Sequence, residues 1–511
     1  MSTTNKFVAI NPFNNEVLEG TYSNPSEDQI NEVVQKAQRA FEIYRQKDRE
    51  TIANFLECMG QEILLLGDAL LERCHLETAL PMARLQGERG RTIAQLNLFA
   101  SVVREGSWVD ARIDTSIPDR LPLPKSDIRH QLIPLGPVAV FGASNFPLAF
   151  SVAGGDTASA LASGCSVIVK AHPAHPGTSE MVAKAIQQAE QKSGIPEGTF
   201  NLIQGNVNEV SEILVQHPLI KAVGFTGSYQ GGKALFALAN LRPEPIPVFA
   251  EMGSTNPVFI LPGAISERGT EIANGLATSI TQGVGQFCTN PGLSFVMRST
   301  NSELFFEQLA AKISEISAGT MLTPNIKKSF DNGIKKVNEI KDVDQLAKGI
   351  LAEEPNAATP IVFKTAIENY LENELLSEEI FGPSSVLVEV DLKEKIIAAA
   401  KQLKGHLTAT IIGNSNDFEE YKELFSILEL KVGRVLINGF PTGVEVCHSM
   451  VHGGPYPATT ASQSTSVGAN AIKRFVRPFC YQDFPDELLP MALKQDNPLN
   501  IWRLVNGNLE K

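Results

Sequence analysis

The feature that most constrains the fold of this chain is an alternation of short apolar runs with helical patterns, which begins after Pro137. Strands that are buried on both faces of a parallel sheet require continuous apolar runs. PVAVFG and CSVIVK are two such runs, and the strand-like stretches FNLIQG and IKAVGFTG follow them. Helical patterns separate them, at residues 155–163, 178–192, 207–217 and 230–238. Since parallel strands are joined by crossover helices, the alternation predicts an α/β fold with a Rossmann-like, doubly wound layer.

The rest of the chain divides around this layer. A length of 511 residues predicts two or three domains, and a second α/β unit is expected from near Asn256 to about residue 455. Helices are expected at 26–47, from residue 52 into the 70s, and at 87–103; Ser26 and Gln29 form a capping box for the first. Residues 117–137 are rich in proline and then extended, and strand character returns after Val467.

Composition excludes several classes of function. The hydrophobic fraction of 43% and charged fraction of 20% are typical of a globular protein. A net charge of -13 argues against binding to nucleic acid or to anionic membranes. We expect neither a signal peptide nor a transmembrane helix, because no suitable apolar run exists. The six cysteines show no CxxC or metal-type spacing, so we expect no metal site and a reducing, cytoplasmic location.

Cys288, in the segment GQFCTN, is the candidate nucleophile. Flanking glycines and Pro291 predict a loop after a helix that begins near Ser266. We expect the thiol to be exposed there and backbone donors to lower its pKa. The alternative, and the commoner role of an isolated cysteine, is a small buried apolar residue.

Two further residues are candidates for acid–base and oxyanion chemistry. Glu251 ends the run IPVFAEMG, and a carboxylate at the end of a buried strand points into the crevice of an open α/β sheet. Partial burial would raise its pKa toward that of a useful base; the alternative is a surface acid. Asn145 follows the PVAVFG strand, and its amide can donate to an oxyanion, although Ser-Asn before Phe-Pro is also a good turn.

Other residues are candidates for holding a dinucleotide. The FTGS turn, with Gly227 and Ser228, precedes a helix whose free N–H groups suit a pyrophosphate. Lys170, at the end of CSVIVK, can bond a ribose hydroxyl or a 2′-phosphate, unless it is a solvated lysine. Glu379, in EEIFGP, can accept from the nicotinamide ribose with Phe381 packed nearby, unless it is only one member of an acidic run.

In this order the motifs SNFP, VIVK, FTGS, EMG, GQFCTN and EEIFGP resemble the aldehyde dehydrogenase superfamily over essentially the whole chain. The stretches RLQGERGRT, KAHPAHPGTSE and VHGGPYPATT are most similar to α-ketoglutaric semialdehyde (2,5-dioxovalerate) dehydrogenases, and a bacterial NADP-linked fatty aldehyde dehydrogenase looks similar there too. The resemblance implies the following organisation: a dinucleotide-binding domain at 1–116 and 138–252, a catalytic domain at 253–466, an oligomerisation arm at 117–137 and 467–485, and a C-terminal tail at 486–511.

The resemblance also implies roles. Cys288 would attack an aldehyde, Asn145 would stabilise the oxyanion, and Glu251 would activate water to hydrolyse the thioester. The chain has EMGSTNP where many members have an ELGGKSP-type stretch, and Ser144 where many have tryptophan. Pro173 stands where NAD-preferring members usually place an acid, which predicts NADP+ as the coenzyme, with NAD+ as the alternative.

Substrate specificity is the most open point. By resemblance Arg91 faces the substrate tunnel together with Phe146, and a guanidinium suits a carboxylate; the alternative for Arg91 is an ion pair with Glu88. The competing functions are oxidation of α-ketoglutaric semialdehyde, oxidation of broad or fatty aldehydes, CoA-dependent acylation, and a structural protein that kept the fold. The family assembles as homodimers or homotetramers, for which the arm near 117–135 and the C-terminal strand are the expected contacts.

Overall fold

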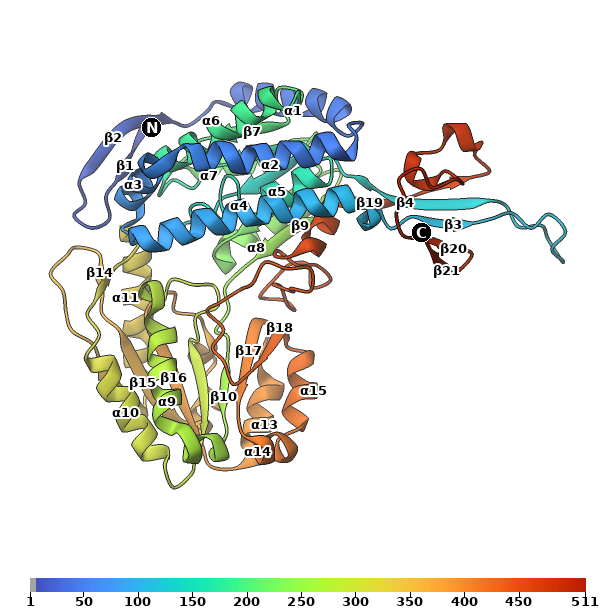
Figure 1. The fold of residues 1–511 in the computed structure, drawn as a ribbon. Helices are drawn as coiled ribbons and strands as arrows, with labels where there is room; N and C mark the ends of the chain where they lie inside the picture. Colours follow the sequence, from blue (N-terminus) through green and yellow to red (C-terminus); the bar gives the residue numbers. More distant parts are fainter. Residues whose placement is uncertain (1–5) are drawn as a thin grey trace.

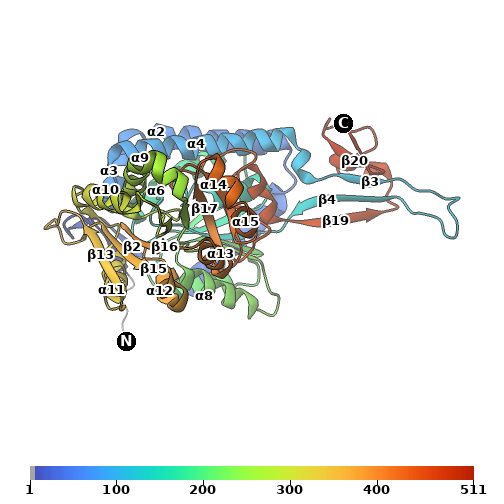
Figure 2. The same cartoon turned by 90° about the horizontal axis from the view of Figure 1, so that it is seen from below.

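The computed structural model describes residues 6–511 and shows two α/β units with an arm that projects to one side (Figure 1; Figure 2). The first unit is built on a parallel sheet with the order β7-β6-β5-β8-β9. Chain order reverses between β5 and β8, and in such sheets ligands bind beyond the carboxyl ends of the strands at that point. The strands are β5 (Val138–Phe141), β6 (Val167–Lys170), β7 (Phe200–Ile203), β8 (Ala222–Thr226) and β9 (Val248–Glu251).

Helices cover both faces of this first sheet because alternate strand residues point to opposite sides. Val138 and Val140 belong to one core, which is shared with α2 to α6, whereas Ala139 and Phe141 belong to a second core with α1, α7 and α8. The helices are α1 (Glu27–Tyr44), α2 (Arg49–Leu65), α3 (Gly67–Thr78), α4 (Met82–Glu105), α5 (Gly155–Ala162), α6 (Pro176–Lys192), α7 (Asn208–Gln216) and α8 (Tyr229–Asn240).

The second sheet has the order β13-β15-β16-β11-β10-β17-β18 and is parallel except for the edge strand β13. Helices α9 and α10 pack on one face, and α11, α12, α13 and α15 pack on the other. Its elements are β10 (Val258–Ile260), α9 (Pro262–Thr281), β11 (Leu293–Met297), α10 (Ser302–Ser314), α11 (Pro324–Asn338), β13 (Val343–Lys348), β15 (Ile361–Ala366), α12 (Ile367–Glu372), β16 (Ser384–Val390), α13 (Lys393–Gln402), β17 (His406–Ile412), α14 (Ser415–Glu420), α15 (Glu423–Glu429) and β18 (Val432–Ile437).

The arm is a third sheet with the order β19-β4-β3-β20-β21. It includes more of the chain than the sequence suggested, because the C-terminal segment adds two short strands and residues 112–114 add one. Its strands are β3 (Arg112–Asp114), β4 (Ile128–Pro134), β19 (Val476–Gln482), β20 (Arg503–Val505) and β21 (Asn508–Glu510). The smaller elements are β1 (Lys6–Ile10), β2 (Val17–Ser23), η1 (Ser107–Val109), η2 (Gln282–Gly285), β12 (Gly319–Thr320), β14 (Ala357–Ala358), η3 (Glu374–Ser377), η4 (Ala469–Phe475), η5 (Asp486–Leu488) and η6 (Met491–Leu493).

The predicted α/β alternation is confirmed, and so is the capping box at the start of α1, where Ser26 and Gln29 cap each other's backbone. The single helix expected after residue 52 is instead two helices, α2 and α3, which meet at Leu66. The third predicted helix begins five residues earlier than expected, at Met82. Within residues 6–511, none of the helices combines the length and the apolar character needed to cross a bilayer.

Candidate active site

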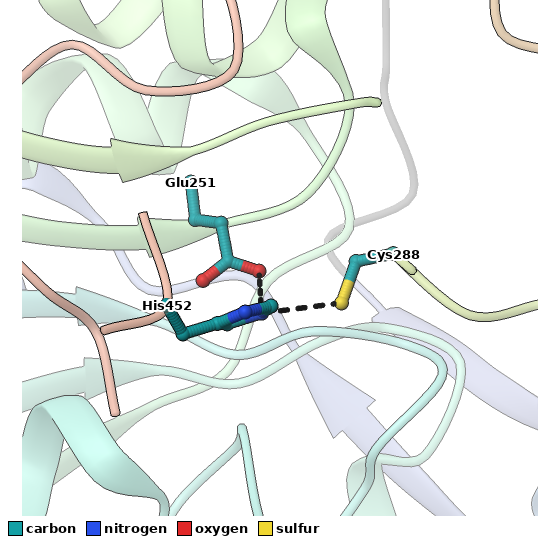
Figure 3. Close-up of side chains that lie close together, drawn as sticks. All are labelled: Glu251, Cys288 and His452. Carbon is teal, nitrogen blue, oxygen red and sulfur yellow. Dashed lines mark hydrogen bonds and ion pairs between the residues drawn. The ribbon is translucent and has the colours of Figure 1, made fainter. Parts of the chain in front are cut away.

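The candidate active site lies where three distant segments meet. Glu251 is the last residue of β9, at the carboxyl edge of the first sheet. Cys288 lies in the loop between η2 and β11 of the second sheet. The chain beyond β18 then returns to the first sheet, where Thr459 forms a bridge with Glu251 and the N–H of Met252 donates to Ala458 O at 2.8 Å. This return brings His452 between the carboxylate and the thiol (Figure 3).

Cys288, His452 and Glu251 form one contact chain. Nε2 of His452 lies 3.5 Å from the Sγ of Cys288 and 3.0 Å from Oε1 of Glu251. Glu251 is 3% exposed and His452 is 1% exposed. The hydroxyl of Ser466 donates to the other carboxylate oxygen and lies 3.0 Å from the carbonyl of His452. The arrangement can therefore move a proton between the thiol, the imidazole and the carboxylate.

The pKa values of the two reactive groups shift in the directions opposite to those predicted. Burial and the charge of Glu251 raise the pKa of the Cys288 thiol well above its usual value. Burial also acts to raise the pKa of Glu251, but the contacts with His452, Ser466 and Cys288 outweigh it and lower that pKa below its usual value. The expectation that backbone donors lower the pKa of Cys288 is therefore wrong, and so is the expectation that burial raises the pKa of Glu251. Both fail because the two groups face each other. Glu251 is thus ionised and the free thiol is protonated near neutral pH.

The loop that carries Cys288 is held tightly. Asn256, just before β10, donates its side-chain amide to the carbonyls of Cys288 at 2.8 Å and Asn290 at 2.9 Å. Upstream, Gly285 has φ 63° and packs against the backbone of Gly382, where a Cβ atom would lie 2.2 Å from the carbonyl oxygen. Only glycine fits this crossing. The EEIFGP segment therefore braces the loop that presents the thiol.

Asn145 is buried, and its environment orients the side chain toward the same loop. Its amide Nδ2 donates to the carbonyl of Gln286 at 3.0 Å, two residues before Cys288. Arg84, from the first turn of α4, donates to the carbonyl of Asn145 at 2.6 Å and stacks on the rings of Phe146 and Phe287. One amide hydrogen of Asn145 is thus used by the protein, and the other is available to a ligand.

A cavity of about 540 Å³ opens onto Cys288. Two guanidiniums line it, those of Arg91 on α4 and Arg434 on β18. Nε and Nη2 of Arg91 and Nε of Arg434 are buried without a hydrogen-bond partner among the described residues. These three groups are therefore available to donate to a bound ligand. Burial lowers the pKa of both guanidiniums, and the nearby Cys288 opposes this shift.

The alternative role of Arg91, an ion pair with Glu88, is not observed within residues 6–511. The Glu88 carboxylate instead accepts the backbone N–H groups of Leu148 at 2.8 Å and Ala149 at 3.0 Å. The rest of the cavity wall combines apolar and polar side chains, and Phe146 is one of them. The remaining lining residues are Phe150, Phe287, Thr289, Thr442, Gly443, Val444, Glu445, Met450 and His452.

Of the residues expected to bind a dinucleotide, Lys170 and Ser228 lie at the carboxyl edge of the first sheet. Glu379 comes from the second unit, just before β16. Ser228 caps α8 by accepting the N–H of Gly231 at 3.2 Å, and a Cβ on Gly227 would meet the Phe225 ring at 2.6 Å. Lys170 ends β6 and is buried, which excludes the solvated lysine, and burial lowers its pKa to about 8.

Lys170 forms no ion pair with a carboxylate in the described part of the chain, so its charge is free for a ligand. Pro173 and the partly buried His172 follow it, and burial holds the pKa of His172 well below its usual value. Glu379 is exposed as a residue, but its carboxylate is tucked against Gly253, and this desolvation raises its pKa to about 7. Phe381 is partly buried.

Sequence reasoning missed His452, Arg434 and Arg84. His452 occurs in the stretch VHGGPYPATT, where a histidine beside two glycines was the available signal. Arg434 lies in KVGRVLING, where the local sequence indicates only an ordinary strand residue. Neither gives any indication in the sequence of its distance to Cys288, because that distance is set by the return of the chain from the second sheet to the first.

The fold and the site together define the class of protein: the chain belongs to the aldehyde dehydrogenase family, whose model matches residues 1–474. The chain is 51% identical over 474 residues to α-ketoglutaric semialdehyde dehydrogenase 2 of Azospirillum brasilense, a match that covers 93% of this chain and 90% of that one. It is 48% identical over 489 residues to α-ketoglutaric semialdehyde dehydrogenase of Acinetobacter baylyi, with 96% and 93% covered.

Solved structures share the fold at lower identity. A betaine aldehyde dehydrogenase double mutant from Staphylococcus aureus, in complex with NAD+, superposes with a TM-score of 0.79 at 20% identity and covers 94% of each chain. The predicted family and its α/β fold are thereby confirmed, and the protein is an NAD(P)+-dependent aldehyde dehydrogenase. This excludes the alternative of a structural protein that merely kept the fold.

Proposed function

We propose that the protein oxidises α-ketoglutaric semialdehyde to 2-oxoglutarate, with NADP+ as the preferred coenzyme. The observation that carries the substrate is the pair of arginines, Arg91 and Arg434, in the wall of the cavity in front of Cys288. Their buried donors have no hydrogen-bond partner within residues 6–511. A substrate with an aldehyde at one end and a 2-oxo acid at the other supplies the acceptors that these donors lack. The names of the two relatives at about half identity support the same substrate.

The first chemical step follows from the contact chain. Because the resting thiol is protonated, its proton must leave as sulfur attacks the aldehyde carbon, and Nε2 of His452 at 3.5 Å is placed to receive it. The ionised Glu251, 3.0 Å from that nitrogen, stabilises the imidazolium that results. The free amide hydrogen of Asn145 donates to the oxyanion that develops on the former aldehyde oxygen.

The residues of the first sheet fit a dinucleotide. We propose that Ser228 and Gly227 hold the pyrophosphate at the start of α8, that Glu379 and Phe381 hold the nicotinamide ribose, and that Lys170 holds the adenine ribose. When bound, the coenzyme accepts the hydride that leaves the carbon attached to Cys288, and a thioester remains. Among residues 6–511, Lys170 forms no ion pair with a carboxylate, and Pro173 brings no charge, which supports acceptance of a 2′-phosphate.

Hydrolysis completes the cycle. Glu251 stays ionised because its pKa is lowered, so its carboxylate can take a proton from water as the water attacks the thioester carbon. The bond between that carbon and Cys288 Sγ breaks, and the proton returns to the sulfur through the same contacts. A water-activating carboxylate in this position favours hydrolysis over transfer of the acyl group to CoA.

Oxidation of longer apolar aldehydes is the second candidate function. Phe146, Phe150, Phe287, Val444 and Met450 form an apolar part of the cavity wall, which an alkyl chain would bury. Under this alternative the two arginines would lie beside the alkyl chain with their buried donors still unpaired, at a cost in free energy. That cost is why the carboxylated substrate is preferred here.

We further propose that the chain assembles as a homodimer or homotetramer through the arm, and that it works in the cytoplasm. The arm projects from the side of the first α/β unit (Figure 1), and its strand β19 forms one edge of the sheet. All six cysteines are free, in keeping with a reducing compartment.

The deciding experiment compares initial rates of NADPH formation with α-ketoglutaric semialdehyde and with decanal, each repeated with NAD+. A higher kcat/KM for the semialdehyde with NADP+ is expected. A preference for decanal would transfer the assignment to fatty aldehydes, and a preference for NAD+ would remove the proposed role of Lys170 at the 2′-phosphate.

A further inference from the structure

We infer that Cys288, His452 and Glu251 also form a binding site for a zinc-type divalent cation, and that occupancy of this site switches the enzyme off. Sγ, a ring nitrogen and a carboxylate oxygen of these residues lie within 4.8 Å of one another (Figure 3). One thiolate, one imidazole and one carboxylate are ligand types that zinc accepts together. The inference goes beyond the proposed function and does not depend on which aldehyde is the substrate.

Two of the three donor–donor distances are close to those around a tetrahedral ion. With zinc–sulfur bonds of about 2.3 Å and zinc–nitrogen and zinc–oxygen bonds of about 2.0 Å, tetrahedral ligands lie about 3.5 Å apart for the S–N edge and about 3.3 Å apart for the N–O edge. The observed Sγ–Nε2 distance is 3.5 Å and the Nε2–Oε1 distance is 3.0 Å. Small rotations of the side chains would therefore complete the geometry.

A second observation points to a ligand at this place. Oε1 of Glu251 is buried and satisfies no hydrogen bond within residues 6–511, although Nε2 of His452 lies close to it. The other oxygen is fixed by Ser466, so Oε1 is held in position. Cys288 and His452 also line the 540 Å³ cavity, which leaves a fourth coordination position open toward solvent or an inhibitor. Three protein ligands with one open position are typical of accessible zinc sites.

Binding of the ion would involve no redox change. The Cys288 thiol gives up its proton to solvent, and the thiolate, the neutral imidazole and the carboxylate then coordinate the cation. Two anionic ligands balance the charge of the dication, which Arg91 and Arg434 in the same wall would otherwise repel. The bound ion withholds the sulfur from the aldehyde and the carboxylate from water, so turnover stops until a chelator removes it.

The test is titration of the coenzyme-free full-length protein with Co²⁺, followed by absorbance, and separately with Zn²⁺, followed by activity. We expect one Co²⁺ per chain, with a near-ultraviolet thiolate-to-cobalt band that Zn²⁺ abolishes, and inhibition by Zn²⁺ that EDTA reverses. Cys288→Ser should lose the band, and His452→Asn should bind Co²⁺ at least about 10-fold more weakly. Cys447→Ser, which alters a partly buried thiol outside the site, is the matched control and should behave as the wild type.

Three results would overturn the inference: no thiolate band in the wild type, a band that survives unchanged in His452→Asn, or loss of the band in Cys447→Ser. The absorbance readout requires no turnover. A protein that shows the band but does not oxidise α-ketoglutaric semialdehyde would refute the proposed function alone, whereas normal oxidation without the band would refute the zinc site alone.

Discussion

Replacing Glu251 with glutamine should make Cys288 more reactive toward an alkylating reagent, even though it stops aldehyde oxidation. The carboxylate raises the pKa of the thiol by its negative charge, and the glutamine removes the charge while keeping the size and an acceptor for Ser466. Turnover is lost because the amide cannot take a proton from water.

The magnitude follows from the distance. Two charges at most 4.8 Å apart interact with about 3.5 kcal/mol at an effective dielectric constant of about 20, which corresponds to a factor of about 300 in the ionisation of the thiol. Intrinsic nucleophilicity falls as a thiol becomes more acidic and cancels nearly half of this gain on a logarithmic scale, so alkylation should be about 25-fold faster.

The assay is labelling with iodoacetamide at pH 7.5 without coenzyme, quantified by mass spectrometry of the peptide that contains Cys288. The exposed Cys480 provides an internal reference, and Glu445→Gln removes an exposed carboxylate from the same cavity wall as the matched control. We expect less than about a twofold change in that control, because water screens an exposed charge. Slower labelling of Cys288 in Glu251→Gln would refute the reasoning and show that the carboxylate acts as the base for the thiol.

The remaining predictions concern substrate, coenzyme and stability. Arg434→Met and Arg91→Met should each lower kcat/KM for succinic semialdehyde by about 10- to 100-fold, which is the contribution of a charge-assisted hydrogen bond. The kcat/KM for butanal, which has no carboxylate, should not change. An equal loss of kcat/KM for both aldehydes would contradict this prediction. The KM for coenzyme should rise as pH falls through about 7, where Glu379 becomes protonated, and Glu379→Gln should abolish that dependence. Burial raises the pKa of Glu190 to about 8, so the folded state keeps a proton that the unfolded state loses above its ordinary pKa, and stability falls as pH rises up to about 8. Glu190→Gln should therefore reduce the drop in urea midpoint between pH 6 and pH 9, and an unchanged drop would assign it to other groups.

Those parts of the fold that depend on local patterns could be predicted from the sequence. Strands β5 and β6 were recognisable because each begins as a continuous apolar run, and α1 was recognisable because two side chains three residues apart, Ser26 and Gln29, form its capping box. Strands β20 and β21 were missed because three residues carry almost no periodicity. Their pairing is decided by β3, which lies far away in the sequence.

The candidate site, like the fold, contains residues that local sequence patterns predict and properties that they do not predict. Cys288, Glu251 and Asn145 follow strands or glycine-rich loops, and those local settings drew attention to them. The protonation of Cys288 and Glu251 could not be deduced residue by residue, since each sets the electrostatic environment of the other and His452 bridges them. Arg434 became visible only when a strand at the far edge of the second sheet was seen to border the same cavity.

The return of the chain from the second sheet to the first has a consequence for folding. The contact of Cys288 with His452 spans 164 residues, and that of Glu251 with Ser466 spans 215. Closure of such long loops is entropically costly and depends on both sheets being in place, so these contacts form late. During refolding, recovery of enzymatic activity should therefore lag behind recovery of the circular dichroism signal, and alkylation of Cys288 would report the final docking event.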